Sequence, residues 1–147
     1  MKGISIITRR LKEGKTYEDF RKAWYHTVGF GTSTKMISAL NIYDPHEIIV
    51  IGFIEGEIEG FEEGLEIDVK ERLENPLDDV IEPEIRRKFG LIVSEDDFSK
   101  LGKLKYKEPS INGVKTDMDK VYSILSVLAE MINKASEKRD KLKEKKL

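Results

Sequence analysis

The 147-residue sequence contains no cysteine and no glutamine, and it has one tryptophan and two histidines. Without cysteine, the chain has no disulfide framework, no thiol nucleophile and no zinc or iron–sulfur site built on thiolates. Because two histidines are a small set of metal ligands, we expect no metal site, and we expect no cofactor. The lack of glutamine, together with many lysine, glutamate and isoleucine residues, resembles the composition of proteins from thermophiles.

The sequence also lacks a long apolar run and an excess of charge of one sign. No segment resembles a signal peptide or a membrane span, so we expect a cytoplasmic protein with no membrane partner. Lysine and arginine number 26 against 28 acidic residues, which gives a formal net charge of −2. Nucleic-acid-binding proteins normally carry a basic excess or stripe, so a nucleic-acid partner is not expected. The length suits one domain with an appendage.

The segment from Glu47 to Glu55 is apolar on both of its alternating faces. A strand with one solvated face would alternate apolar and polar residues, and this one does not. One face would carry Ile48, Val50, Gly52 and Ile54, and the other Ile49, Ile51 and Phe53. An exposed apolar face of this size usually marks an interface. We therefore expect helices to cover one face of the sheet and a second subunit to cover the other.

Periodicity and turn residues predict the remaining elements. Further strands are expected at residues 4–11, 35–43 and 101–106, and helices at residues 17–28, 61–75 and 116–135. A type I turn at Asp44–Glu47 would join the second and third strands. Residues 77–89 are interpreted as a broken helix, and residues 136–147 as a frayed end. The last helix carries a heptad seam of Met118, Val121, Leu125, Leu128, Ile132 and Ala135.

This β-α-β-β-α-β order is that of an α+β, ferredoxin-like fold with a four-stranded antiparallel sheet, here with a long C-terminal helix. The strand Ile4–Ile7, the segment Gly14–Trp24 and the two-sided third strand resemble the dimeric α+β barrel superfamily. The resemblance covers residues 1–107, and residues 116–147 would serve packing or oligomerisation. It implies a homodimer, or a larger homo-oligomer, whose sheets pack face to face. Members of the superfamily range from cofactor-free monooxygenases and haem-binding enzymes to proteins with no known reaction, so fold alone assigns no activity.

Three residues are candidates for catalysis. His26 could move protons near neutral pH, although its place opposite the apolar side of the first helix favours an exposed residue. Asn41 and Tyr43 bring an amide and a phenol into an apolar row of the second strand, where a ligand could satisfy them. The alternative for both is a polar strand end at the hairpin.

Two further residues are candidates for ligand binding. Arg9, next to Arg10 at the end of the first strand, could hold an anionic group through its guanidinium; a surface charge is the alternative. Trp24 lies on the apolar stripe of the first helix and could stack on a substrate, although packing in the core is favoured.

The sequence therefore predicts a small homo-oligomer that binds, and could turn over, a small apolar or aromatic molecule in a pocket between sheet and helices. The alternative is a non-catalytic assembly or regulatory module that acts through its C-terminal helix. Whether the region Leu77–Ser99 forms a lid or a support stays open.

Overall fold

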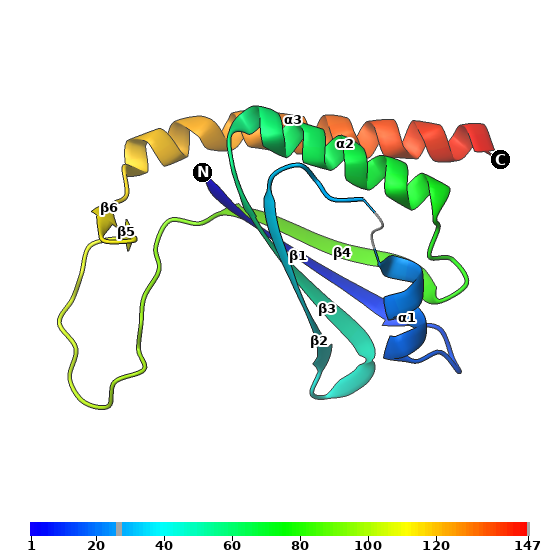
Figure 1. Ribbon diagram of the computed structural model, residues 1–147, viewed down its shortest axis with the longest axis horizontal. Helices are drawn as coiled ribbons and strands as arrows, with labels where there is room; N and C mark the ends of the chain where they lie inside the picture. The colour runs from blue at the N-terminus through cyan, green and yellow to red at the C-terminus, as the bar shows by residue number, and fades with distance from the viewer. Residues whose placement is uncertain (26–27, 147) are drawn as a thin grey trace.

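The computed structural model describes residues 1–25 and 28–146 (Figure 1). In chain order the elements are β1 (Lys2–Leu11), α1 (Tyr17–Trp24), β2 (Ser33–Asn41), β3 (Asp44–Glu55), α2 (Ile58–Glu74), β4 (Ile81–Leu91), β5 (Ser110–Ile111), β6 (Val114–Lys115) and α3 (Met118–Lys146). The fold is α+β with a long C-terminal helix, as the sequence predicts.

The four long strands form one antiparallel sheet in the order β2-β3-β1-β4. β1 lies inside the sheet, with β3 on one side and β4 on the other. The register between β1 and β3 pairs Ser5 with Gly52 and Ile6 with Ile51. The two strands that carry the most apolar sequence are thus the two central ones, where both faces of the sheet need cover.

The register also fixes which side chains share a face, because neighbouring residues of a strand point to opposite sides. Ile48 and Val50 of β3 are buried on the side that carries the helices. The opposite side, which we call the open sheet face, carries a row in which Ile6, Ile51 and Ile37 are cross-strand neighbours. The large apolar residues of the open sheet face are Ile4, Ile6, Ile37, Ile49, Ile51 and Phe53.

A capping box starts α1. The Thr16 hydroxyl accepts a hydrogen bond from the Asp19 amide at 3.3 Å, and the Asp19 carboxylate accepts one from the Thr16 amide at 2.9 Å. The sequence predicts this helix to residue 28, but it ends at Trp24, since Tyr25 has an extended conformation. The Arg72 guanidinium of α2 donates to the Trp24 carbonyl at 3.0 Å, which satisfies one of the carbonyls left at the helix end.

The hydrophobic core lies where α1 meets the ends of β1 and β3. Phe20 is fully buried there, and Trp24 stacks on it with ring centroids 5.8 Å apart. The buried members are Leu11, Phe20, Ile48, Val50, Leu77, Val80 and Ile81. Because α1 is one short helix of eight residues, it covers only this end of the sheet.

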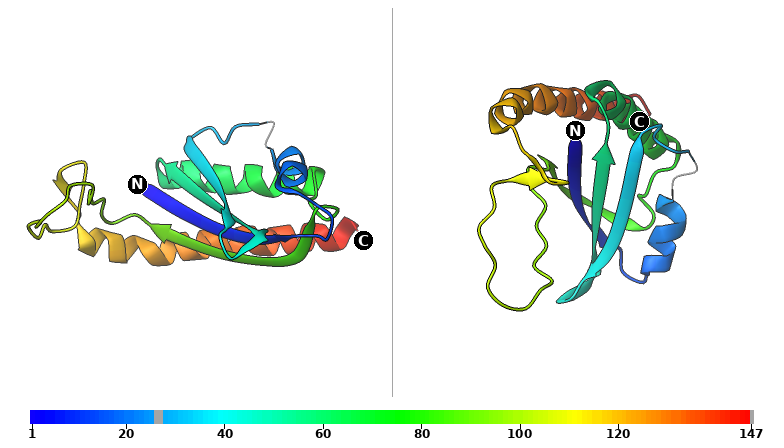
Figure 2. Two further views of the ribbon diagram at one scale, coloured as in Figure 1. Left: turned by 90° about the horizontal axis from the view of Figure 1, so that it is seen from below. Right: turned by 60° about the vertical axis from the view of Figure 1, so that its left-hand side comes forward.

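The helices α2 and α3 cover the other end of the same side. They contact each other and lie above the strands in Figure 1 and in the right view of Figure 2. Gly56, just before α2, lies close to the connection that leads into β2, since a Cβ added there would lie 2.5 Å from the Thr32 hydroxyl. At Gly60 and Gly64 of α2 an added Cβ would lie 3.6 Å from the Thr32 hydroxyl and 4.0 Å from Phe30, which is ordinary contact. The close approach of this connection therefore requires glycine at position 56.

The interpretation of residues 77–89 as a broken helix is wrong, because residues 81–91 form β4. Proline removes a backbone donor, so within a sheet it occurs at edges and irregularities. β4 is an edge strand, and Pro83 lies where its register with β1 shifts, between the pairs Arg9–Ile85 and Leu11–Ile81. The interruption that suggested a helix break is a bulge.

The predicted strand at residues 101–106 is also wrong. β4 already occupies the free edge of β1, and the segment from 101 to 106 lies outside the sheet with Leu101 and Tyr106 exposed. The chain instead forms the small β5–β6 hairpin around Asn112 and Gly113. Both of these residues have positive φ, the conformation that a tight hairpin turn of this kind requires.

Two boundaries differ from the sequence prediction. The turn between β2 and β3 lies at Ile42–Tyr43, and β3 already begins at Asp44. The last helix extends to Lys146 instead of fraying from residue 136. Its continuation places Arg139 over the sheet side that carries the helices.

Candidate functional site

A cavity of about 360 Å³ lies between the sheet and the helices α2 and α3. We call it the helix-side cavity. Its floor comes from Gly3, Ser5 and Ile7 of β1 with their neighbours on the other strands, and its walls come from the two helices. The apolar lining includes Ile7, Ile54, Phe61, Leu65, Val69, Phe89, Leu125, Leu128, Met131 and Ile132.

Small residues keep the floor of the cavity low. Ser5 is buried and is paired with Gly52, and a Cβ added at Gly52 would lie 2.6 Å from the Ser5 hydroxyl and 3.0 Å from the Met36 sulfur. A Cβ added at Gly3 would lie 3.6 Å from the Phe61 ring. Protein interiors normally fill such space with large side chains. Glycine and serine at these positions leave a hollow where the other end of the sheet has a packed core.

The heptad seam of α3 supplies one wall. Leu125, Leu128, Ile132 and Ala135 all line the cavity. The apolar stripe that suggested a partner helix is therefore turned toward the sheet and α2 of the same chain.

The charged residues at the cavity gather at one end. Among residues 1–25 and 28–146, Asp68, Arg87 and Arg139 are the charged side chains in its lining. Burial, followed by the charge of Arg139, lowers the pKa of Arg87. Two arginines against one aspartate leave this end of the cavity with an excess of positive charge.

Two more arginines stand beside this pair. Burial, and then the charges of Arg87, Arg72 and Arg139, lower the pKa of Arg9 to about 10. Burial also lowers the pKa of Arg72, while Asp68 and Glu71 oppose that change. Such shifts show that guanidinium groups have been brought together at a partly desolvated place.

The hydrogen bonds and salt bridges of the four arginines show which of them holds elements of the fold together. Arg72 donates to the carbonyls of Trp24 at 3.0 Å and Asn75 at 3.4 Å, so it ties α2 to the end of α1. The Nε atoms of Arg72 and Arg87 are buried without a hydrogen-bond partner among the residues that the structure describes. In the same part of the chain, Arg9, Arg87 and Arg139 form no salt bridge.

Arg9 was predicted to bind a ligand. The register pairs it with Ile48 of β3 on one side and Ile85 of β4 on the other, so it lies on the cavity side of the sheet. The sequence did not single out Asp68, Arg87 or Arg139. A usable signal existed for Arg87, since Ile85, Arg87, Phe89 and Leu91 alternate with charged residues and glycine. That alternation indicates a strand with an arginine in its apolar row.

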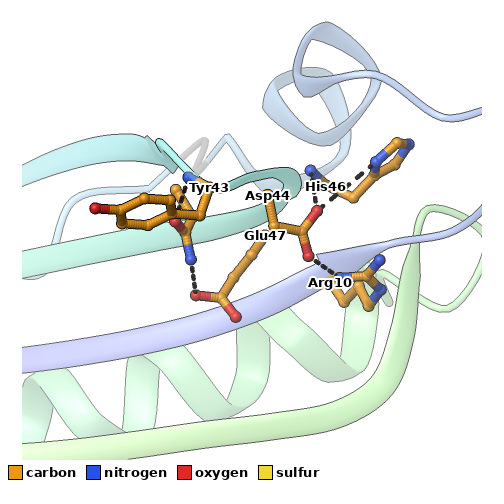
Figure 3. A network of polar contacts seen from close by, with 6 residues as sticks. Arg10, Tyr43, Asp44, His46 and Glu47 are labelled. Atoms are coloured by element: carbon orange, nitrogen blue, oxygen red, sulfur yellow. Dashed lines mark hydrogen bonds and ion pairs between the residues drawn. The ribbon is translucent and has the colours of Figure 1, made fainter.

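The two candidates on the β2–β3 hairpin lie elsewhere. The Asn41 amide donates to the Glu47 carboxylate at 3.1 Å, and its oxygen accepts from the Tyr43 amide at 2.9 Å. Figure 3 shows a second set of contacts in the same hairpin, in which Asp44 accepts from the His46 amide at 3.1 Å and is bonded to Arg10. Tyr43 is 97% exposed. These contacts close the hairpin turn, and neither Asn41 nor Tyr43 lines the cavity.

The remaining candidates do not meet at the cavity either. Trp24 packs against the core cluster through Phe20, and it does not line the cavity. His26 lies outside the described residues. Within the described ranges, no group of three or more histidine and acidic side chains could hold a metal ion. No helix in that part of the chain has the length and apolar character to cross a membrane.

Comparisons of the chain with models of protein families, with curated proteins and with solved structures find no match in any of the three. The helix-side cavity and its arginines are therefore judged on their own geometry.

Proposed function

We propose that the protein binds a small, mainly apolar molecule in the helix-side cavity. The cavity itself carries this proposal. Its volume of about 360 Å³ falls within the range of about 300–1,000 Å³ usual for small-molecule sites, which are mostly apolar with a few placed polar groups. The sequence predicted a pocket between sheet and helices, and binding is favoured over turnover because Asn41 and Tyr43 are outside its lining.

A neutral fluorescent probe such as N-phenyl-1-naphthylamine tests this proposal. Its fluorescence should rise on binding to the wild-type protein, and Ala135→Phe should abolish the rise because a ring at this lining position occupies the cavity. Ser126→Phe is the matched control, since Ser126 is exposed on the same helix and outside the lining. Equal binding by both variants would sink the proposal. Native mass spectrometry of the purified protein would identify a retained ligand.

We further propose that β1 to β4 with α1 and α2 form a ferredoxin-like domain. In the split β-α-β arrangement, a third strand separates the two strands that each helix connects. β3 lies between β1 and β2, which α1 connects, and β1 lies between β3 and β4, which α2 connects. The short α1 and the added α3 are departures, and α3 takes over cover that a longer α1 would supply.

We also propose that a second copy of the chain covers the open sheet face. The helices α1, α2 and α3 all pack on the other side of the four-stranded sheet, and the open sheet face is apolar at its centre. Charges of both signs surround it, with Lys35 and Lys88 on the outer strands and Glu47 and Glu55 at the ends of β3. Such a rim suits a copy related by two-fold symmetry, which can place acids against bases.

Light scattering after size exclusion tests the dimer. Ile37→Glu places a charge on the open sheet face at a residue that is 49% exposed in the single chain, so it should yield monomers without unfolding them. Ile42→Glu is the control, because Ile42 is 94% exposed at the hairpin tip. A wild-type monomer, or a dimer that survives Ile37→Glu, would contradict the proposed interface.

The alternative of an assembly module acting through α3 has less support. Leu125, Leu128, Ile132 and Ala135 of the α3 seam line the cavity of its own chain. The exposed large apolar residues of this helix are Tyr122, Val127 and, at the mouth of the cavity, Leu125. Deletion of residues 117–147 separates the two: loss of probe binding with an intact oligomer supports the cavity, and loss of the oligomer supports the helix as the contact.

A further inference from the structure

The helix-side cavity is polar at one end and apolar at the other. Gly3 pairs with Leu91 and Ile7 with Arg87, so Arg87 lies further along the sheet by four residues, about 13 Å at about 3.3 Å per residue. On α3, about four helical turns separate Leu125 from Arg139. Both elements therefore run from an apolar end, near Leu125 and Phe61, to an arginine end.

The arginine end has more positive charge than its own carboxylates balance. Arg87 and Arg139 line it together with Asp68, and Arg9 is close enough for its charge to be felt. Guanidinium groups repel one another at a partly buried place, and a buried donor without a partner is unfavourable. In the free protein the charges of Asp68 and Asp140 offset the burial of Arg87 only in part, because burial and Arg139 act more strongly in the opposite direction. A bound anion would supply the missing acceptor.

The size of the excess indicates the charge of that anion. Among the described residues, Arg9, Arg87 and Arg139 face Asp68 and Asp140, so one negative charge restores balance. Arginine presents a planar pair of donors that matches the two oxygens of a carboxylate. The apolar lining of the rest of the cavity offers a nucleotide or sugar few polar partners, whereas an alkyl or aromatic body fits it.

We infer that the ligand of the helix-side cavity is a carboxylate with an apolar body, its carboxylate held by Arg87 and Arg139 and its body lying between α2, α3 and the sheet. This inference rests on the proposed function, because it assigns the chemistry of the molecule that the cavity binds. Arg9 acts as a neighbouring charge that increases the attraction for the anion.

Displacement of N-phenyl-1-naphthylamine by decanoate and by decanol tests the inference, since the two differ only in the head group. Decanoate should bind wild-type protein at least tenfold more tightly than decanol. Arg87→Met should weaken the affinity for decanoate at least tenfold and leave the affinity for decanol within about twofold of the wild-type value. Arg87→Lys keeps the charge without the paired donors, so its affinity for decanoate should lie between those of the wild-type protein and Arg87→Met. Lys70→Met is the matched control, because Lys70 is exposed on α2, pairs with Glu74 and lies outside the lining of the cavity.

The outcomes separate the two proposals. Equal affinity for decanoate and decanol, or equal weakening of both by Arg87→Met, would overturn the carboxylate while leaving the apolar cavity in place. If neither the probe nor either decyl compound binds, the proposed function fails and this inference fails with it. Competition by inorganic phosphate at concentrations similar to those of decanoate would show that the arginines bind anions without using the apolar body, which would also overturn the inference.

Discussion

Replacing Arg87 by methionine should make the free protein more stable, although it removes a partly buried charged residue. In most proteins, loss of a buried arginine destabilises the fold, because the carboxylate that it paired with is left alone. Arg87 forms no salt bridge within the described residues, and its buried Nε has no hydrogen-bond partner there. The side chain therefore imposes a cost that a neutral residue of similar length would remove.

The magnitude follows from the groups around Arg87. A buried donor without a partner costs about 1–3 kcal/mol. Methionine relieves that cost and the repulsion from Arg139, and it gives up the attraction of Asp68 and Asp140, which act in the opposite direction. Because methionine is unbranched and adapts to irregular space, it should retain most of the packing of the arginine stem. We expect a net gain of about 1 kcal/mol, which corresponds to a rise in Tm of about 2–4 °C for a chain of this size.

Thermal and urea unfolding measure this gain, with Lys70→Met as the control. Lys70 is exposed on α2 and paired with Glu74 at 3.9 Å, so its replacement should change the free energy of unfolding by less than about 0.5 kcal/mol. Added decanoate should reverse the ranking, because a ligand at about 100 times its Kd stabilises the wild-type protein by about 2.7 kcal/mol. A lower Tm for Arg87→Met without ligand would refute the reasoning, since it would show that Arg87 already has its partner inside the fold.

Three further predictions concern stability. Phe20→Ala should cost about 3–5 kcal/mol in urea unfolding, because Phe20 is fully buried at the centre of the core. Gly64→Ala should raise the free energy of unfolding by about 0.5–1 kcal/mol, and Tm with it, since its new Cβ meets nothing closer than 4.0 Å. Gly56→Ala should lower both quantities, since its Cβ would lie 2.5 Å from the Thr32 hydroxyl. Equal shifts for the two variants would contradict this reasoning. Thr16→Ala should cost about 1 kcal/mol by removing the N-cap of α1, and Thr16→Ser should restore most of it.

The central part of the fold could be predicted because its signals are local and redundant. The unbroken apolar run of residues 48–54 identifies a strand whatever lies around it. The Thr16–Asp19 capping box marks the start of α1 within a residue. A pattern of this kind depends on backbone geometry that is the same in every protein.

The edge of the sheet could not be predicted in the same way. Residues 77–85 contain a proline and apolar residues at mixed spacings, so helix and strand agree equally well with them, and the alternation of residues 85–91 is the one local sign of a strand. What decides for a strand is that β1 has a free edge, and residues 81–91 follow α2 closely enough to reach it. The segment 101–106 alternates more regularly, yet β4 already pairs with the edge of β1 that it would need. Both segments could pair with the same edge, and the local sequence does not show which of them does.

The arginine cluster shows the same limit at the level of chemistry. Arg9, Arg87 and Arg139 come from β1, β4 and α3, far apart in the chain, and each alone is a common charged residue. Their meeting depends on β4 pairing with β1 and on α3 continuing beyond residue 136, which are two of the places where the sequence prediction was wrong. A site assembled from three elements inherits the errors of all three. Once the strand register is known, however, an arginine in the apolar row of an edge strand is conspicuous, because nothing in the packing of the free chain accounts for it and a bound anion would.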